Sequence, residues 1–251
     1  MKRILRITAI AAATAVVLAA VNFAPMISRK TPGMREYESH GITVFAVPRD
    51  KDEVPRIAER IARQSARIVA SLGTESGDDI SVIIYPDRQA LHRKTIGLAG
   101  LLLPDWFIGD NTKNFVLVTS PAQPGPAHTR ESIEQAAVHE YTHLLTDRRN
   151  QALGYWLKEG IALYLAEQEP DSASIRVHRD LTWDEYANPN ALQFAEVGGY
   201  TLAYTLIDYV QRHHGWDAVV ALSARGASYE SVVGIPEHDV FDAWISELQS
   251  I

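Results

Sequence analysis

The segment His139-Glu140-Tyr141-Thr142-His143 constrains the structure of this chain more than any other feature of its sequence. Residues four positions apart on a helix lie on the same face, about one turn from each other. Two imidazoles in this arrangement can bind one metal ion, and the glutamate between them projects beside that ion. The pattern therefore needs a helix across these five residues and a third ligand from elsewhere in the chain.

The sequence around the motif predicts this helix. Residues 129–147 contain no Gly or Pro, and their apolar side chains recur near the helical period. Thr129 and Ser132 are candidate N-cap residues. Glu131 and Glu134 add negative charge in the first turn, where the helix dipole favours it. The two histidines therefore lie in the middle of a predicted helix.

Glu159 is the candidate third ligand. It lies 16 positions after His143, on a second apolar-periodic helix predicted over residues 155–164 after a turn at Gly154. A solvated surface glutamate is the alternative, but apolar residues flank Glu159, and an uncompensated buried carboxylate is costly. Coordination of a metal ion is one compensation. Two imidazoles, one carboxylate and a water would complete a four-coordinate zinc site.

The chain resembles the small peptidase MA-like gluzincins in two motifs, His139-Glu140-x-x-His143 and Trp156-Leu157-x-Glu159-Gly160-x-Ala162-x-Tyr164. The resemblance covers most of the chain after about residue 40. It implies that His139, His143 and Glu159 bind one catalytic Zn²⁺ ion, and that Glu140 is the general base that activates a zinc-bound water. It also implies an α+β, zincin-like fold with a small mixed β-sheet and helices at the N-terminal side, an active-site helix that carries the HExxH motif, and a C-terminal helical subdomain.

Other zinc-peptidase patterns fit less well. The metzincin pattern needs Gly and His at the third and sixth positions after His143, where this chain has Thr146 and Arg149, so that branch is excluded. Thermolysin-like gluzincins carry an acidic residue four positions after the glutamate ligand, to orient a histidine. Leu163 stands there in this chain, so the sequence does not identify the hydrogen-bond partner of the ligands.

Tyr200 is the second candidate catalytic residue. Gluzincins often place a Tyr or His from the later part of the chain against the tetrahedral intermediate. Tyr200 follows Gly198 and Gly199, and Tyr204 lies one helical turn behind it. The alternative is that either tyrosine is simply a hydrogen-bonded aromatic residue of the core.

Residues 1–30 are distinct from the rest of the chain. A basic start is followed by a mostly apolar run from Ile7 to Ile27, close to the length that spans a bilayer. A cleaved signal peptide needs small residues at its cleavage site, and the candidate sites here match poorly. The sequence therefore favours a signal anchor with its basic end in the cytoplasm over a signal peptide. Both interpretations put the later residues outside the cytoplasm, in a periplasmic or extracellular space.

Residues 36–251 are predicted to form a single peptidase MA-like catalytic domain. Its αβ lobe, residues 36–150, carries the motif helix, and its helical lobe, residues 151–251, carries the glutamate ligand. Strands are predicted over residues 42–47, 80–85 and 114–119, and helices over 52–72, 87–96, 180–186, 199–213 and 236–248.

The resemblance also suggests how substrate binds. By analogy with the family, the strand nearest the motif helix lies at the sheet edge above the zinc. We therefore expect residues 115–119 at that edge, where an extended peptide can pair by strand addition.

The net charge bears on possible partners, and the cysteine content bears on disulfides. The net charge is −7, and residues 1–30 contribute five basic residues and no acidic ones, so the remainder is more acidic still. Such a domain argues against a nucleic-acid partner. The chain contains no cysteine, so it forms no disulfides.

The sequence thus predicts a zinc-dependent metallopeptidase that hydrolyses peptides or proteins outside the cytoplasm and is attached to the membrane by its N-terminal segment. It carries no Gly-x-Met-Glu-Asn motif of aminopeptidases, which favours an endopeptidase. One alternative is a catalytically silent zincin-fold binding module tethered to the membrane. The other is a non-metal protein with a chance motif. The oligomeric state is not predicted.

Overall fold

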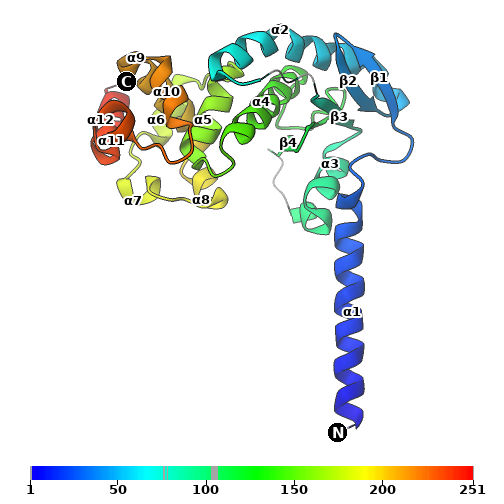
Figure 1. Ribbon diagram of the computed structural model, residues 1–251. Helices are drawn as coiled ribbons and strands as arrows, with labels where there is room; N and C mark the ends of the chain where they lie inside the picture. Colours follow the sequence, from blue (N-terminus) through cyan, green and yellow to red (C-terminus); the bar gives the residue numbers. More distant parts are fainter. Residues whose placement is uncertain (1, 76, 78, 103–106, 251) are drawn as a thin grey trace.

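A computed structural model describes residues 2–75, 77, 79–102 and 107–250 (Figure 1). A long N-terminal helix leads into a domain that combines one five-stranded sheet with helices, and the C-terminal half of this domain is helical. The predicted α+β class is therefore confirmed.

The sheet is mixed. Its strands are β1 (Arg35–Ser39), β2 (Ile42–Ala46), β3 (Ser81–Tyr85), β4 (Gly109–Thr112) and β5 (Phe115–Thr119). Their order is β1-β2-β3-β5-β4, with β2, β3 and β5 parallel and the two outer strands antiparallel to their neighbours. The three strands predicted from the sequence are β2, β3 and β5. Their continuous β-branched sequences are typical of parallel strands that are buried on both faces.

Helices cover both faces of the sheet. In β3, Val82 and Ile84 belong to the large core shared with α2 (Val54–Leu72) and α4 (Arg130–Arg149). Ile83 and Tyr85 belong to a smaller cluster with α3 (Arg88–Thr95). This alternation follows from the two-residue period of a strand.

The helices of the first half begin and end at residues that the sequence indicates. A 3₁₀ turn, η1 (Pro48–Glu53), precedes α2, which has Pro55 in its first turn and ends at Gly73. Gly73 has a φ of 59°, a left-handed conformation that costs glycine little. Asp87 caps α3 by accepting a hydrogen bond from the backbone N–H of Ala90 at 2.8 Å. The predicted helices over 52–72 and 87–96 are therefore confirmed.

The C-terminal half contains α5 (Tyr155–Leu165), α6 (Ser172–His178), α7 (Trp183–Tyr186), α8 (Ala191–Glu196), α9 (Gly199–His214), α10 (Trp216–Leu222), α11 (Tyr229–Val233) and α12 (Glu237–Gln249). The four helices predicted here correspond to α5, α7, α9 and α12. The hydrophobic core of α2, α4 and the sheet continues without interruption into these helices.

Helix α5 lies unusually close to α9. A Cβ atom at Gly160 would be 2.5 Å from the carbonyl oxygen of Ala203 and 2.6 Å from Cγ1 of Ile207, so only glycine fits at this crossing. The adjacent Trp156 is held by a 2.9 Å hydrogen bond from its indole N–H to the carbonyl oxygen of Tyr186. These contacts fix the helix that carries Glu159.

The expectation that residues 115–119 form the sheet edge is wrong. Strand β4 pairs with β5 and occupies the edge itself, joined to β5 by a two-residue turn at Lys113 and Asn114. Lys113 has a φ of 48°, as such a tight hairpin turn requires. The sequence Gly-Asp-Asn-Thr of β4 lacks the apolar, β-branched residues that indicate a strand, so the sequence pattern does not reveal it.

Helix α1 (Lys2–Ile27) extends away from the domain as a single rod (Figure 1). Its residues Arg6–Ile27 are long and apolar enough to cross a membrane, a property that an N-terminal signal sequence shares.

Candidate metal centre

The two histidines of the motif lie in the buried middle of α4. Thr129 caps this helix: its hydroxyl accepts a hydrogen bond from the backbone N–H of Ser132 at 3.1 Å, and the Ser132 hydroxyl accepts one from the Thr129 N–H at 3.0 Å. The predicted N-cap is thus confirmed. This reciprocal capping fixes where α4 begins and therefore which of its faces meets α5.

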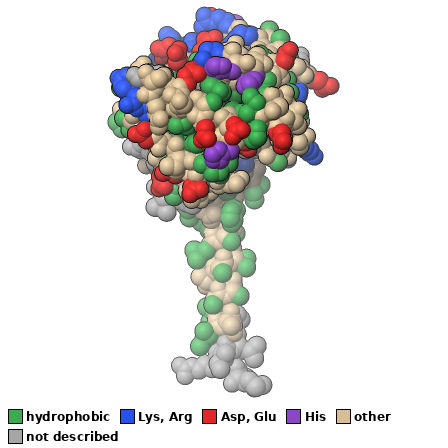
Figure 2. All heavy atoms as spheres, turned by 90° about the vertical axis from the view of Figure 1, so that its left-hand side faces the viewer, with side chains coloured by type: hydrophobic (Ala, Val, Ile, Leu, Met, Phe, Trp, Pro, Cys, Tyr) green, Lys and Arg blue, Asp and Glu red, His purple; other side chains and the backbone are tan. Residues whose placement is uncertain are grey.

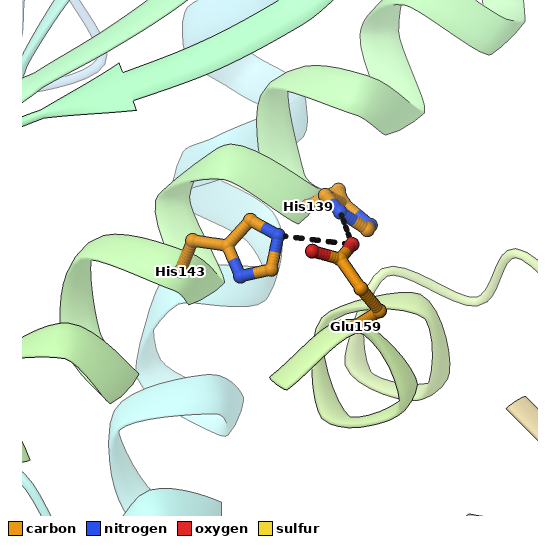
Figure 3. Close-up of side chains that lie close together, drawn as sticks. All are labelled: His139, His143 and Glu159. Carbon is orange, nitrogen blue, oxygen red and sulfur yellow. Dashed lines mark ion pairs between the residues drawn. The ribbon is translucent and has the colours of Figure 1, made fainter. Parts of the chain in front are cut away.

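The side chains of His139, His143 and Glu159 converge on one point between α4 and α5 (Figure 3). The Nε2 atoms of both histidines are 3.3 Å from Oε2 of Glu159. The imidazole planes are at 89° to each other, with ring centroids 4.5 Å apart. In a tetrahedral zinc site with bonds of about 2.0–2.1 Å, the donor atoms lie about 3.3 Å from one another. The two histidine–carboxylate distances are close to this value, and the three ligand atoms all lie within 4.8 Å of one another, so the group could hold a metal ion.

Burial and charge favour the protonation states that bind metal. Burial lowers the pKa of His143, against the opposing effect of Glu159, which favours the neutral imidazole. Burial alone would raise the pKa of Glu159. His143 and His139 outweigh this effect through their charge and their hydrogen bonds, and they lower the pKa of Glu159 well below its ordinary value. The neutral form of His143 and the ionised form of Glu159, which these shifts favour, are the forms that coordinate metal ions.

Gln168 orients the first histidine. Nδ1 of His139 is 2.9 Å from Oε1 of Gln168, which accepts a hydrogen bond from this ring nitrogen, and the contact leaves Nε2 facing Glu159. Nδ1 of His143 is also buried, and it has no hydrogen-bond partner among the described residues.

The turn after α5 positions Gln168. Glu167 is in the left-handed conformation with a φ of 58°. The N–H of Gln168 donates to the carbonyl of Leu163 at 3.0 Å, and the N–H of Glu167 donates to that of Tyr164 at 3.2 Å. This pair of bonds is a Schellman motif, which ends the helix and reverses the chain toward α4. Arg67 of α2 holds the turn by donating to the Leu165 carbonyl at 2.7 Å.

A polar pair links the two motif helices. Nζ of Lys158 donates to Asp147 at 2.8 Å, which connects α5 to the last turns of α4. Nδ2 of Asn111, on β4, donates to the same carboxylate at 3.2 Å. Lys158 adjoins Glu159 in sequence, so this link helps fix the position of the candidate ligand relative to α4.

The candidate ligands open into a cavity of about 880 Å³. Its lining includes Glu140, Tyr200 and the β4 residues Gly109, Asp110 and Asn111. This volume lies in the range of pockets that bind small molecules.

Glu140 lies between the candidate ligands and the edge strand. A Cβ atom at Gly109 would be 2.8 Å from Oε1 of Glu140, so the absence of a side chain there lets β4 approach this carboxylate. Burial raises the pKa of Glu140 well above its ordinary value, and the carboxylates of Asp110 and Glu159 add to the effect. A bound cation would counteract this concentration of negative charge.

Tyr200 lies at the start of α9 and lines the same cavity. Its side chain is 38% exposed, and its ring meets that of Phe194 edge to face at 5.2 Å. Burial, followed by Glu159 and Glu140, raises the pKa of Tyr200, so its hydroxyl remains a proton donor at neutral pH. Tyr204 instead contacts Tyr164 at a ring distance of 5.2 Å and does not line the cavity.

The structure thus gathers all five sequence-predicted site residues around one cavity: His139, Glu140, His143, Glu159 and Tyr200. Gln168 and the β4 residues belong to the same site and were not predicted. No sequence signal marks Gln168, which lies 29 positions after the histidine that it contacts. No protein-family model matches the chain, and a search of the curated proteins finds no match.

Proposed function

We propose that this chain is a zinc-dependent metallopeptidase of the gluzincin type, held by α1 at a membrane and acting outside the cytoplasm. One observation carries the proposal: the Glu159 carboxylate lies 3.3 Å from Nε2 of both His139 and His143, in a buried cluster beside Glu140. Two imidazoles and one carboxylate are the protein ligands of many catalytic zinc sites, which leave one position open.

The donor set fits zinc in type as well as in spacing. All three groups are buried, and the contact with Gln168 orients the His139 ring so that its Nε2 faces the common centre. A buried carboxylate between two imidazoles, with further carboxylates at Asp110 and Glu140 nearby, is costly without a cation. A bound zinc ion supplies Lewis acidity, which polarises a carbonyl group and lowers the pKa of a coordinated water.

The chain's own residues then move the protons. Glu140 accepts a proton from the attacking water at its carboxylate and passes it to the nitrogen of the leaving amine. The Tyr200 hydroxyl donates a hydrogen bond to the carbonyl oxygen of the substrate, which becomes negative as water adds. Glu140 is buried beside Gly109, so little of its side chain meets bulk water.

The edge strand β4 is the proposed substrate platform. The sheet order ends at β4, so no described strand pairs with its outer edge, and Gly109 to Asn111 line the cavity. An extended peptide can add to such an edge through main-chain hydrogen bonds. This mode of binding does not depend on a peptide end, and it supports an endopeptidase.

The function is tested with a diverse peptide mixture and the purified chain, with products identified by mass spectrometry. We expect internal cleavages that stop on addition of a chelator and return on addition of zinc. A chain that contains zinc but cleaves no peptide would contradict the proposal and favour a catalytically silent binding module. Cleavage that persists in the chelator would argue against a metallopeptidase.

Gln168→Ala is expected to weaken zinc binding by about 10–100-fold, the usual effect of removing an outer partner of a metal-bound histidine. The reason is the loss of the acceptor that fixes the tautomer of His139. Competition with a fluorescent zinc chelator measures the affinity. Gln168→Glu, which keeps an acceptor oxygen, should retain tight binding, and Gln249→Ala at the distant end of α12 is the control. Equal affinity of Gln168→Ala and the wild type would remove Gln168 from this role.

A further inference from the structure

Helix α1 is joined to the domain by a group of hydrogen bonds. The amine of Lys94, a buried side chain of α3, donates to the carbonyl oxygens of Ser28 and Lys30 at 2.5 and 3.2 Å, just after α1 ends. Arg29 donates in return to the Lys94 carbonyl. The hydroxyl of buried Tyr85 donates to the Arg29 carbonyl at 2.7 Å. These bonds fix the direction in which α1 leaves the domain.

A second contact lies further down α1. The side-chain oxygen of Asn22 accepts a hydrogen bond from the backbone N–H of Leu98 at 2.7 Å. Leu98 belongs to the 3₁₀ segment η2 (Gly97–Leu102). Gly97 has a φ of 73°, and a Cβ atom there would collide with the Asn22 carbonyl oxygen, so η2 runs directly against α1. Figure 1 shows this corner of the domain beside the upper part of the rod.

The position of Asn22 in α1 determines how deep the adjoining segment η2 lies relative to a bilayer. The apolar run ends at Ile27, and five residues of helix correspond to about 7.5 Å. If the run spans a hydrocarbon core of about 30 Å, Asn22 lies about 7.5 Å inside its outer boundary. A polar group at that depth needs a partner within the protein. The Leu98 N–H is such a partner for the Asn22 side chain.

The exposed side chains around this contact have the character expected at the surface of a membrane. Ile96 and Leu98 are apolar and 38% and 44% exposed, and the exposed Phe23 of α1 directly follows Asn22, the partner of Leu98. Charged Lys30 and Arg93 are exposed near the same junction, where anionic headgroups would meet them. Figure 2 shows hydrophobic side chains along the described part of the rod and charged ones spread over the domain above it.

We propose that the corner formed by Ile96 and η2 is a second membrane contact, which inserts Ile96 and Leu98 into the outer leaflet of the bilayer beside α1. The domain then stands on the membrane in one orientation instead of moving freely on a tether. This inference depends on α1 being a retained membrane helix, and it does not depend on catalysis.

The chain has no cysteine, so single-cysteine variants can be labelled at chosen positions. Leu98→Cys and Ile96→Cys probe the corner, Phe23→Cys reports insertion of α1, and Val177→Cys, 74% exposed on α6, is the matched control. Each full-length variant is labelled with an environment-sensitive fluorophore. It is then reconstituted in phosphatidylcholine–phosphatidylglycerol vesicles that contain lipids with a shallow nitroxide quencher.

We expect blue-shifted emission and several-fold stronger quenching at positions 98, 96 and 23 than at 177. Quenching at 23 with none at 96 and 98 would show that α1 inserts and the corner stays in water, which overturns the proposal. The absence of quenching at all three positions would overturn it as well, because α1 would not be inserted. Neither outcome involves peptide cleavage or zinc content, so failure here is distinguishable from failure of the proposed function.

Discussion

Glu140→Gln is expected to reduce peptide cleavage by about 10²–10⁴-fold, the range for removal of a general acid–base group, and to leave zinc content unchanged. The amide has nearly the same shape as the carboxylate and cannot accept the water proton. Glu140 also lies outside the candidate ligand set. The measurement combines initial cleavage rates with zinc analysis on the same protein preparation.

Stability serves as a second readout for this variant. Burial and the neighbouring Asp110 and Glu159 disfavour the ionised form of Glu140, so a neutral amide should not lower the free energy of unfolding. Glu131→Gln is the control, because Glu131 is exposed on the first turn of the same helix. Normal turnover by Glu140→Gln would show that another group is the base.

Glu159→Ala is expected to weaken zinc binding by more than about 100-fold, which is the upper limit for removing a hydrogen-bond partner of a ligand. The effect is larger here because the substitution removes a direct ligand. Cleavage should be lost together with the metal. Glu169→Ala, an exposed glutamate shortly after α5, is the matched control and should bind zinc like the wild type. Zinc analysis after dialysis against a weak chelator separates the two variants. Unchanged zinc in Glu159→Ala would exclude this carboxylate from the coordination sphere.

The sequence predicts the parts of the site that depend on local periodicity. His139 and His143 share a helix face because they are four positions apart, and Thr129 caps that helix through its own neighbour Ser132. Glu159 was predicted by its motif and apolar flanks. The position of Glu159 beside the two histidines depends on the close crossing of α5 and α9 at Gly160.

The parts that the sequence does not predict depend on contacts between distant segments. Strand β4 is polar and short, and it forms because β5 supplies its hydrogen-bond partners through a tight turn. Gln168 reaches His139 because Glu167 adopts a left-handed conformation that sequence patterns assign mainly to glycine. Sequence periodicity therefore could not predict strand β4 or the role of Gln168 as the partner of His139, although both lie at the candidate metal centre.

The most direct test of the central claim is the metal content of the purified full-length chain, measured by elemental mass spectrometry after exchange into metal-free buffer. We predict one zinc ion per chain in the wild type and almost none in His143→Ala, whose substitution removes one of the two imidazoles on α4. A wild-type chain that holds no zinc, even after incubation with zinc and removal of the excess, would contradict the account.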